Sequence, residues 1–153
     1  MTEACEMPAS NPTPDEIREI LETSRVVAVV GLSSSEERDS NRVARYLMDH
    51  GYKVVPVNPA EREILGQRSY PDLASIPFPV DVVDIFRKVE FIPAIVDEAI
   101  AKGARVVWMQ LGLAHNESAE KARSAGLGVV QSRCIKIEHE SLAGRGPYPA
   151  GVP

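Results

Sequence analysis

An apolar run, Val26–Val30, breaks at Gly31 into the small-residue loop Leu32–Ser35. Apolar residues that do not alternate with polar ones are typical of a parallel strand covered on both faces. A helix is expected to begin near Ser40 or Asn41, so the order is strand, small-residue loop and helix. Such a loop brings backbone N–H groups close to an anion at the start of the helix. Taken alone, the pattern leaves open whether the loop binds a ligand or only connects two elements.

The rest of the chain alternates between apolar runs and helical periodicities. Further strands are expected at Lys53–Val57, Val80–Phe86, Arg105–Met109 and Gly128–Gln131, with a short extra strand near Gln67–Tyr70. Helices are expected from Thr13, over Asn41–His50, between Ile92 and Gly103 and over Asn116–Ala125, and a short ordered piece at Ile135–Leu142. The alternation predicts an α/β fold: a Rossmann-like, doubly wound parallel sheet of about five strands in three α/β/α layers.

The predicted order of the strands in space places Lys53–Val57 at one edge, followed by Val26–Val30, Val80–Phe86, Arg105–Met109 and Gly128–Gln131. The winding direction reverses between the second and third of these strands, which opens a crevice at their carboxyl ends. The loops expected to meet there are residues 31–40, Asn58-Pro59, residues 86–90 and Gln110–Gly112. This topology favours a ligand site at the opening stretch.

The chain of 153 residues suits one domain, which would bury about two-thirds of its unfolded surface. We expect a flexible lead-in over residues 1–12, the folded domain over 13–143 and a flexible tail over 144–153. The tail holds three prolines and three glycines. At the domain start, Thr13 and Glu16 have the spacing of a helix capping box.

Composition excludes several classes of function. A net charge of −5 argues against a protein that grips nucleic acid, and no apolar run is long enough to span a bilayer. The acidic N-terminus lacks the apolar core of a signal peptide. With only Cys5 and Cys134, the chain has no disulfide framework. We therefore expect a cytoplasmic protein.

The obvious ligand of such a sheet, a dinucleotide, fits poorly. Gly31 is a single glycine where the dinucleotide fingerprint has three. The strand that ends in Asn58-Pro59 offers no acidic residue for a ribose, and no P-loop lysine follows Gly31. The loops instead supply serine hydroxyls and four arginines, namely Arg38, Arg42, Arg62 and Arg87. Converging arginines suit a ligand with several phosphates, although surface arginines also simply solvate an acidic protein.

At this point the chain resembles the stand-alone coenzyme A-binding proteins, whose fold is like the N-terminal CoA-binding domain of the succinyl-CoA synthetase alpha subunit. The resemblance covers about residues 25–140. The segments that carry it are Val30–Ser33 with Arg38–Ser40, Gly51–Pro59, Asp81–Arg87 and Trp108–Gly112. Together these segments are specific, whereas any one alone would be weak.

The resemblance implies that the CoA pyrophosphate lies over Gly31–Ser34 and the helix that begins near Asn41. The adenosine end would follow the loops after the strands Lys53–Val57 and Val80–Phe86, with Arg62 as a candidate partner of a CoA phosphate. The candidate ligand-binding set is Gly31, Leu32, Ser33, Ser34, Arg38, Ser40, Asn41, Asn58, Pro59, Arg62, Ile85, Phe86, Arg87, Gln110 and Gly112.

We assign no catalytic residue and no metal site from the sequence. His115 is a loop histidine without an identified partner, and Asp84 is expected to cap loop N–H groups. Cys134, flanked by Arg133 and Lys136, is either a partly buried cysteine or a thiol able to form a mixed disulfide with CoA. The leading hypothesis is a small CoA or acyl-CoA binding protein without proven catalysis. The alternatives are an NAD(P)-dependent oxidoreductase and a ligase-type subunit that needs a partner domain, and a homo-oligomer is a further option.

Overall fold

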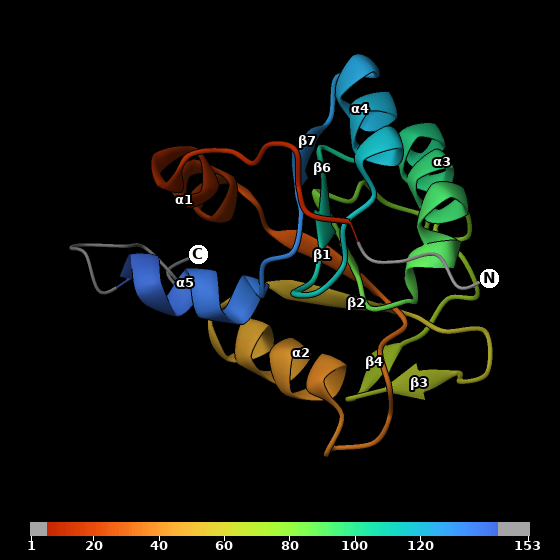
Figure 1. Cartoon of the computed structure of the whole chain (residues 1–153). Helices are drawn as coiled ribbons and strands as arrows, with labels where there is room; N and C mark the ends of the chain where they lie inside the picture. The colour runs from red at the N-terminus through yellow and green to blue at the C-terminus, as the bar shows by residue number, and fades with distance from the viewer. Residues whose placement is uncertain (1–5, 144–153) are drawn as a thin grey trace.

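A computed structural model describes residues 6–143 of the chain as a parallel sheet with helices on both sides (Figure 1). The helices are α1 (Pro14–Thr23), α2 (Asp39–Asp49), α3 (Ile92–Lys102), α4 (Asn116–Ser124) and α5 (Ile135–Ala143). The strands are β1 (Val26–Val30), β2 (Lys53–Val57), β3 (Glu63–Ile64), β4 (Gln67–Arg68), β5 (Val82–Ile85), β6 (Val106–Met109) and β7 (Gly128–Val130). A 3₁₀ turn, η1 (Val89–Phe91), precedes α3. The predicted fold class is confirmed.

The main sheet has the predicted order, β2-β1-β5-β6-β7, and its pairs are parallel. β1 lies between β2 and β5, with Val30 opposite Val57 on one side and Ile85 on the other. The direction of winding therefore reverses between β1 and β5, at the expected switch point. A separate antiparallel hairpin, β3 with β4, follows β2 where one short strand was expected.

β5 is shorter than the run of apolar residues that predicted it. It begins after Asp81, whose Oδ2 accepts hydrogen bonds from the N–H groups of Arg25 and Val26, both at 2.9 Å. This carboxylate joins the first residues of β1 and β5. Val80 and Asp81, which were predicted to belong to the strand, lie before β5. The Asp81 side chain thus joins β1 and β5 at their amino ends, opposite the carboxyl ends where the crevice at the switch point was expected.

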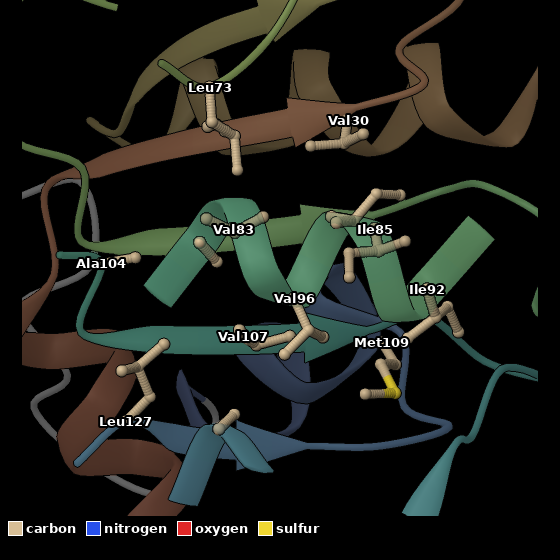
Figure 2. Close-up of a cluster of buried hydrophobic side chains, with 14 of the residues drawn as sticks. Val30, Leu73, Val83, Ile85, Ile92, Val96, Ala104, Val107, Met109 and Leu127 are labelled. Atoms are coloured by element: carbon tan, nitrogen blue, oxygen red, sulfur yellow. The ribbon is translucent and has the colours of Figure 1, made fainter. Parts of the chain in front are cut away.

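Two clusters of apolar side chains cover the two faces of the sheet. On the α3–α4 face, Val83 and Ile85 of β5 pack with Val107 and Met109 of β6 beneath α3, and Val96 lies between them in Figure 2. The alternate residues, including Trp108, point to the α1–α2–α5 face. These two clusters produce the three-layer architecture (Figure 1).

Local sequence signals set the ends of α1 and α3. The Thr13 hydroxyl accepts from the Glu16 N–H at 3.2 Å, and the Glu16 carboxylate accepts from the Thr13 N–H at 2.8 Å, which confirms the capping box. α3 ends at Gly103, whose φ of +80° is readily adopted only by glycine. Both helix boundaries therefore follow from short-range chemistry.

Residues 6–12 of the expected lead-in lie against α4 and β7. Asn11 exchanges two hydrogen bonds with the backbone of Gln131, each 2.8 Å long. The Ala9 N–H donates to Asn116 Oδ1 at 2.8 Å. This part of the chain thus has a defined position that its composition did not predict. Residues 1–5 and the expected tail 144–153 lie outside the described residues. Within the described range, no helix is long and apolar enough to cross a membrane.

Candidate functional site

Gly31 brings the loop after β1 into contact with the loop after β5. Its φ is +90°, and a Cβ atom built there would lie 2.7 Å from the Phe86 carbonyl oxygen and 2.9 Å from Arg87 Cδ. The Gly31 N–H donates to the Val57 carbonyl at 3.0 Å, so the same residue also contacts the end of β2. The glycine is required by this close approach of three strand ends.

The loop after Gly31 is held by hydrogen bonds from the start of α2 and from the end of β2. Ser40 Oγ accepts from the Ser33 N–H at 3.0 Å, and Asn41 Nδ2 donates to the Ser33 carbonyl at 2.8 Å. Asn58 Nδ2 donates to the Leu32 carbonyl at 3.0 Å. The side chains of Ser40, Asn41 and Asn58 therefore shape the loop, and a ligand would meet a preorganised backbone.

Charged side chains surround the first turn of α2. Arg42 pairs with Asp39 and donates to the Glu37 carbonyl. Arg45 donates to Asn41 Oδ1 at 2.9 Å and to the Glu36 carbonyl at 3.0 Å. Arg38 is exposed at the N-cap position of α2. These arginines offset the acidic residues that follow the serine loop.

A cleft of about 570 Å³ opens on one side of this loop. We call it the α5 cleft because the start of α5 forms one of its walls. Its lining residues are Asp39, Arg42, Val43, Phe86, Arg87, Lys88, Gln110, Leu111, Leu113, Cys134, Lys136 and Ile137. The cleft therefore runs from the first turn of α2, past the ends of β5 and β6, to the first turn of α5.

A second cleft of about 390 Å³, here the β2 cleft, lies beyond the end of β2. Its lining residues are Asn58, Pro59, Glu61, Arg62, Arg68, Ser69 and Pro71. Ser34 Oγ donates to Glu61 Oε2 at 3.3 Å, so the serine loop reaches the edge of this cleft. The loop after β1 thus touches lining residues of both clefts, Phe86 and Arg87 through Gly31 and Glu61 through Ser34, although residues 31–38 line neither.

The structure divides the predicted residues between these places. Phe86, Arg87 and Gln110 line the α5 cleft, whereas Asn58, Pro59 and Arg62 line the β2 cleft. The remaining residues of the β1–α2 connection that were predicted are Gly31, Leu32, Ser33, Ser34, Arg38, Ser40 and Asn41. No ligand contact of these residues is tested by the structure, so their roles in binding stay predictions.

Nine of the fifteen predicted residues line neither cleft, and Ile85, Leu32 and Gly112 are three of them. Ile85 is fully buried on the α3–α4 face, and Leu32 is fully buried on the other face, so neither side chain is available to a ligand. Gly112 donates its N–H to Ser132 Oγ at 3.1 Å and lines neither cleft. Alternate residues of a strand point to opposite faces, which explains why the Ile85 side chain packs in the core; a contact of its backbone with a ligand stays a prediction.

Sequence reasoning missed part of both clefts. It did not assign Lys88, Lys136 or Ile137 to the α5 cleft, or Arg68 to the β2 cleft. Lys88 directly follows the predicted Arg87 and was within reach of the loop argument. The two α5 residues had no local signal, because the helix reaches the site through packing against α1 and α2 (Figure 1).

His115 and Asp84, the two other residues considered for chemistry, lie in positions that contribute to the fold. His115 is the N-cap of α4, and its Nδ1 accepts from the Ser118 N–H at 3.2 Å. The expectation that Asp84 caps loop N–H groups is wrong: among residues 6–143 neither of its carboxylate oxygens has a hydrogen-bond partner. The carboxyl is fully buried, and burial raises the pKa of Asp84 well above its usual value. Burial therefore favours the protonated form of this carboxyl over the charged form.

Comparisons with known proteins identify relatives of the whole chain. A family model described as a CoA binding domain matches residues 25–140. An uncharacterized protein of Bacillus subtilis (strain 168), YneT, is 39% identical over 129 residues, which is 84% of this chain and 96% of that protein. The solved structure of a hypothetical protein from Pyrococcus horikoshii OT3 has a TM-score of 0.86 at 44% identity, covering 94% of this chain and 100% of that one.

A longer relative is matched over part of its length. The chain is 29% identical over 129 residues to the ADP-forming acetate–CoA ligase I of Archaeoglobus fulgidus. The match covers 78% of this chain but 19% of the ligase. The chain therefore spans about a fifth of this relative.

Proposed function

The chain belongs to the CoA-binding domain family, and from that membership we propose that it binds coenzyme A or an acyl-CoA, with the pyrophosphate held by the loop after β1. The observation that carries the proposal is a preorganised loop that touches lining residues of two clefts, one through Gly31 and the other through Ser34. CoA is a long ligand with a charged nucleotide at one end and a thiol at the other. Two clefts that could take the two ends of CoA, joined by a loop that could bind the pyrophosphate, suit that shape.

The first turn of α2 supports the central contact. Helix N-termini attract anions because their backbone N–H groups have no partner within the helix. Ser33 and Ser34 carry hydroxyls beside this turn, and Arg42 lines the adjacent cleft. In this proposal the backbone near Ser33 receives the pyrophosphate, and the arginines complement its charge.

The β2 cleft supports the nucleotide end. Arg62 and Arg68 both line it, and their side chains offer the planar forks that match phosphate oxygens. Glu61 lies in the same cleft. Its carboxylate accepts a hydrogen bond from the Ser34 hydroxyl, so one carboxylate oxygen points toward the serine loop. We propose that the 3′-phosphate of CoA lies with Arg62 in this cleft.

Binding is tested by calorimetry and thermal unfolding of the full chain. A ligand present at ~100 times its Kd raises the free energy of unfolding by roughly 2.7 kcal/mol. We expect such a rise with CoA or acetyl-CoA and none with NADH. Absence of binding at millimolar CoA, or NADH binding that CoA does not displace, would overturn the proposal.

Dephospho-CoA tests which cleft takes the nucleotide end. If Arg62 contacts the 3′-phosphate, Arg62→Ala should weaken CoA binding about tenfold or more and leave dephospho-CoA binding unchanged. Arg105→Ala is the matched control, because Arg105 is an exposed arginine just before β6, at the opposite edge of the sheet. Equal losses for both ligands would place the 3′-phosphate elsewhere.

A partner polypeptide is a second proposal that the comparisons favour. The relative named an ADP-forming acetate–CoA ligase is about five times the length of the matched segment. A chain of this kind would supply a CoA site to a separate ligase-type subunit. Co-purification with such a subunit supports this reading, and a self-contained homo-oligomer that binds CoA alone weakens it.

A further inference from the structure

We propose that Tyr46 and His139 act as a positioning pair that holds the two helical walls of the α5 cleft at a fixed separation, and that the cleft loses affinity for its ligand when His139 takes up a proton. The inference rests on the proposed function only for the identity of that ligand, CoA. Neither residue lines the cleft. Both would act through the helices that carry them, α2 and α5, which pack against each other (Figure 1).

The pair lies one helical turn behind the walls of the cleft. Arg42 lines the cleft from α2, and Tyr46 follows it four residues later. Lys136 lines the cleft from α5, and His139 follows it three residues later. Residues three or four apart lie on the same side of a helix. Because the Tyr46 hydroxyl and His139 Nδ1 are hydrogen-bonded at 2.6 Å, their bond sets the distance between the two walls.

The α5 helix depends on this contact because it is short. It has nine residues, and its apolar anchors Ile135 and Leu142 lie near its two ends, both buried in the cluster of the α1–α2–α5 face. His139 lies between these anchors and is fully buried as well. The Lys136 ammonium lies 5.3 Å from the centre of the Tyr46 ring, which is a second contact between the same two helices. The middle of α5 is therefore fixed to α2 by Tyr46.

The surroundings of His139 favour its neutral form. The His50 ring meets it edge-on at a centroid distance of 5.1 Å, and the Tyr52 ring does so at 5.8 Å. Burial lowers the pKa of His139 from 6.5 to about 4, with His50 adding to the effect and Glu140 opposing it. A protonated ring could still donate to the Tyr46 oxygen. The cost of protonation is therefore the buried charge and not the loss of the bond.

The carboxylates of α5 have basic partners. Glu140 accepts from Lys136 at 3.2 Å, and Glu138 pairs with Arg133 at 3.7 Å. Both ion pairs are partly exposed to solvent. Exposed pairs interact weakly, so they supply little counter-charge to a buried ring.

The elements that pack around α5 add little negative charge. On α1, Glu22 pairs with Arg18 at 2.9 Å. On the sheet, Asp84 is fully buried, and burial raises the pKa of its carboxyl well above the usual value, which favours the protonated form. A proton on His139 would thus place a charge inside the docked structure with little to compensate it.

Proton uptake therefore weakens the packing of α5 on α2. Above pH 6.5, His139 is neutral whether or not the helix is docked, and its contact with Tyr46 contributes in full. Between pH 6.5 and 4, the undocked helix binds a proton that the docked helix does not, so docking weakens as the pH falls. From these two pKa values, the ratio of undocked to docked α5 should rise about 25-fold between pH 7.5 and pH 5. Undocking removes the wall that carries Lys136 and Ile137.

Hydrogen–deuterium exchange of the full chain tests the pair without a ligand. Protection factors correct for the intrinsic effect of pH on exchange, and those of α5 should fall about 25-fold between pH 7.5 and pH 5. They should also be lower than those of α3 at both pH values, because α5 opens without global unfolding. His139→Asn keeps an acceptor near the position of Nδ1 and cannot titrate, so this pH dependence should disappear. Equal protection of the two helices, or protection of α5 that does not change with pH, would overturn the inference.

Calorimetry with CoA at the same two pH values tests the effect on the ligand. Between pH 7.5 and pH 5, the affinity of the unsubstituted chain should fall about threefold more than that of His139→Asn. The comparison of the two chains cancels the protonation of CoA itself. Tyr46→Phe removes the hydroxyl bonded to His139 Nδ1 and should weaken CoA binding at pH 7.5 by about tenfold. Tyr70→Phe is the matched control and should bind CoA normally, because Tyr70 packs on Phe78 with the cluster of the α3–α4 face.

The outcomes separate the pair from the proposed function. CoA binding with the same pH dependence in the unsubstituted chain and in His139→Asn would refute the role of the pair and leave the proposed function intact. Absence of CoA binding at both pH values would refute the proposed function and, with it, CoA as the ligand of the cleft. The exchange data would then still decide whether the pair fixes the α5 wall.

Discussion

The two faces of the sheet are built from neighbouring residues of the same strands, yet they differ in what they bury. On the α3–α4 face, Val83 and Ile85 of β5 contact an apolar cluster. On the α1–α2–α5 face, the alternation places the buried Asp84 carboxyl beside Val82, and the α5 residue His139 is fully buried. The α5 cleft opens on this second face. Packing of the α1–α2–α5 face should therefore depend on pH more strongly than packing of the α3–α4 face.

Aromatic and titratable side chains hold the helices of the second face together. The Tyr46 hydroxyl and His139 Nδ1 are hydrogen-bonded at 2.6 Å, which joins α2 to α5. The Tyr46 ring stacks on His50 with a centroid distance of 4.0 Å. The Tyr52 hydroxyl donates to the Leu21 carbonyl at 2.6 Å and so ties α1 to the start of β2. Burial raises the pKa of Tyr46 to about 12, with Glu140 and Tyr52 adding to the effect.

Trp108 and Met109 give the largest expected effect, because these adjacent residues point to opposite faces. Both are fully buried. Trp108→Ala should lower the free energy of unfolding by about 3–5 kcal/mol and Met109→Ala by about 2–5 kcal/mol. The Trp108 side chain donates to the Arg133 carbonyl, whereas Met109 contacts Arg133 only through a backbone hydrogen bond that alanine would keep. CoA binding by the folded protein should therefore weaken only in Trp108→Ala. Urea unfolding and calorimetry measure both quantities, and an equal loss of CoA affinity would erase the proposed difference between the faces.

Because of His139, we expect the free energy of unfolding to fall in acid. Burial lowers the pKa of His139 from 6.5 to about 4, and His50 adds to this effect while Glu140 opposes it. Below pH 6.5 the unfolded chain binds a proton that the folded chain does not, so stability falls as the pH falls toward 4. The loss should reach about 3 kcal/mol. Urea midpoints between these pH values measure it.

His139→Phe is the variant that removes this acid sensitivity. Phenylalanine cannot titrate, so the slope of stability against pH should flatten even if the variant is less stable overall. His115→Asn is the matched control, because asparagine also caps a helix and His115 belongs to α4. An unchanged slope in His139→Phe would assign the acid sensitivity to other groups.

Asp84 predicts a dependence of opposite sign on the same face. Because burial raises the pKa of Asp84, the unfolded chain releases a proton above about pH 4 that the folded chain retains. Stability from this group is therefore complete below that pH and declines as the pH rises. Asp84→Val, which also removes a buried polar group without a partner, should raise the free energy of unfolding at neutral pH by about 1–3 kcal/mol.

Asp84→Asn separates the two causes. It cannot ionise, so it should abolish the decline with rising pH while keeping most of the cost of a buried polar group. Denaturant unfolding at several pH values measures both variants. A loss of stability in Asp84→Val at neutral pH would mean that the carboxyl is stabilised in the folded protein.

Thr13 gives the smallest effect and concerns only the docking of α1. Thr13→Ala removes the N-cap acceptor for Glu16 and should cost about 1 kcal/mol. Thr23→Ala, at the other end of α1, should change stability by less than about 0.5 kcal/mol. Thermal unfolding compares them, and the pH slope assigned to His139 should persist in both.

Local patterns were sufficient to predict most elements and their order. The apolar run before Gly31 matched β1, and the crossover rules led to the order β2-β1-β5-β6-β7. The capping box at Thr13 and the glycine at 103 marked helix ends, because these signals act within a few residues. The same reasoning placed the loops around the switch point and so identified residues of both clefts.

The sequence by itself therefore determined the fold and the edge of the sheet where the loops around the switch point meet. Only the tertiary structure decided which side chains face that edge: Ile85 turned into the core, Asp84 remained without a partner, and α5 brought Cys134 and Lys136 to the cleft. The physical reason is the distance along the chain over which each interaction acts. Propensity, capping and periodicity act over one or two turns, whereas the walls of the α5 cleft come from segments about 95 residues apart, joined only by packing.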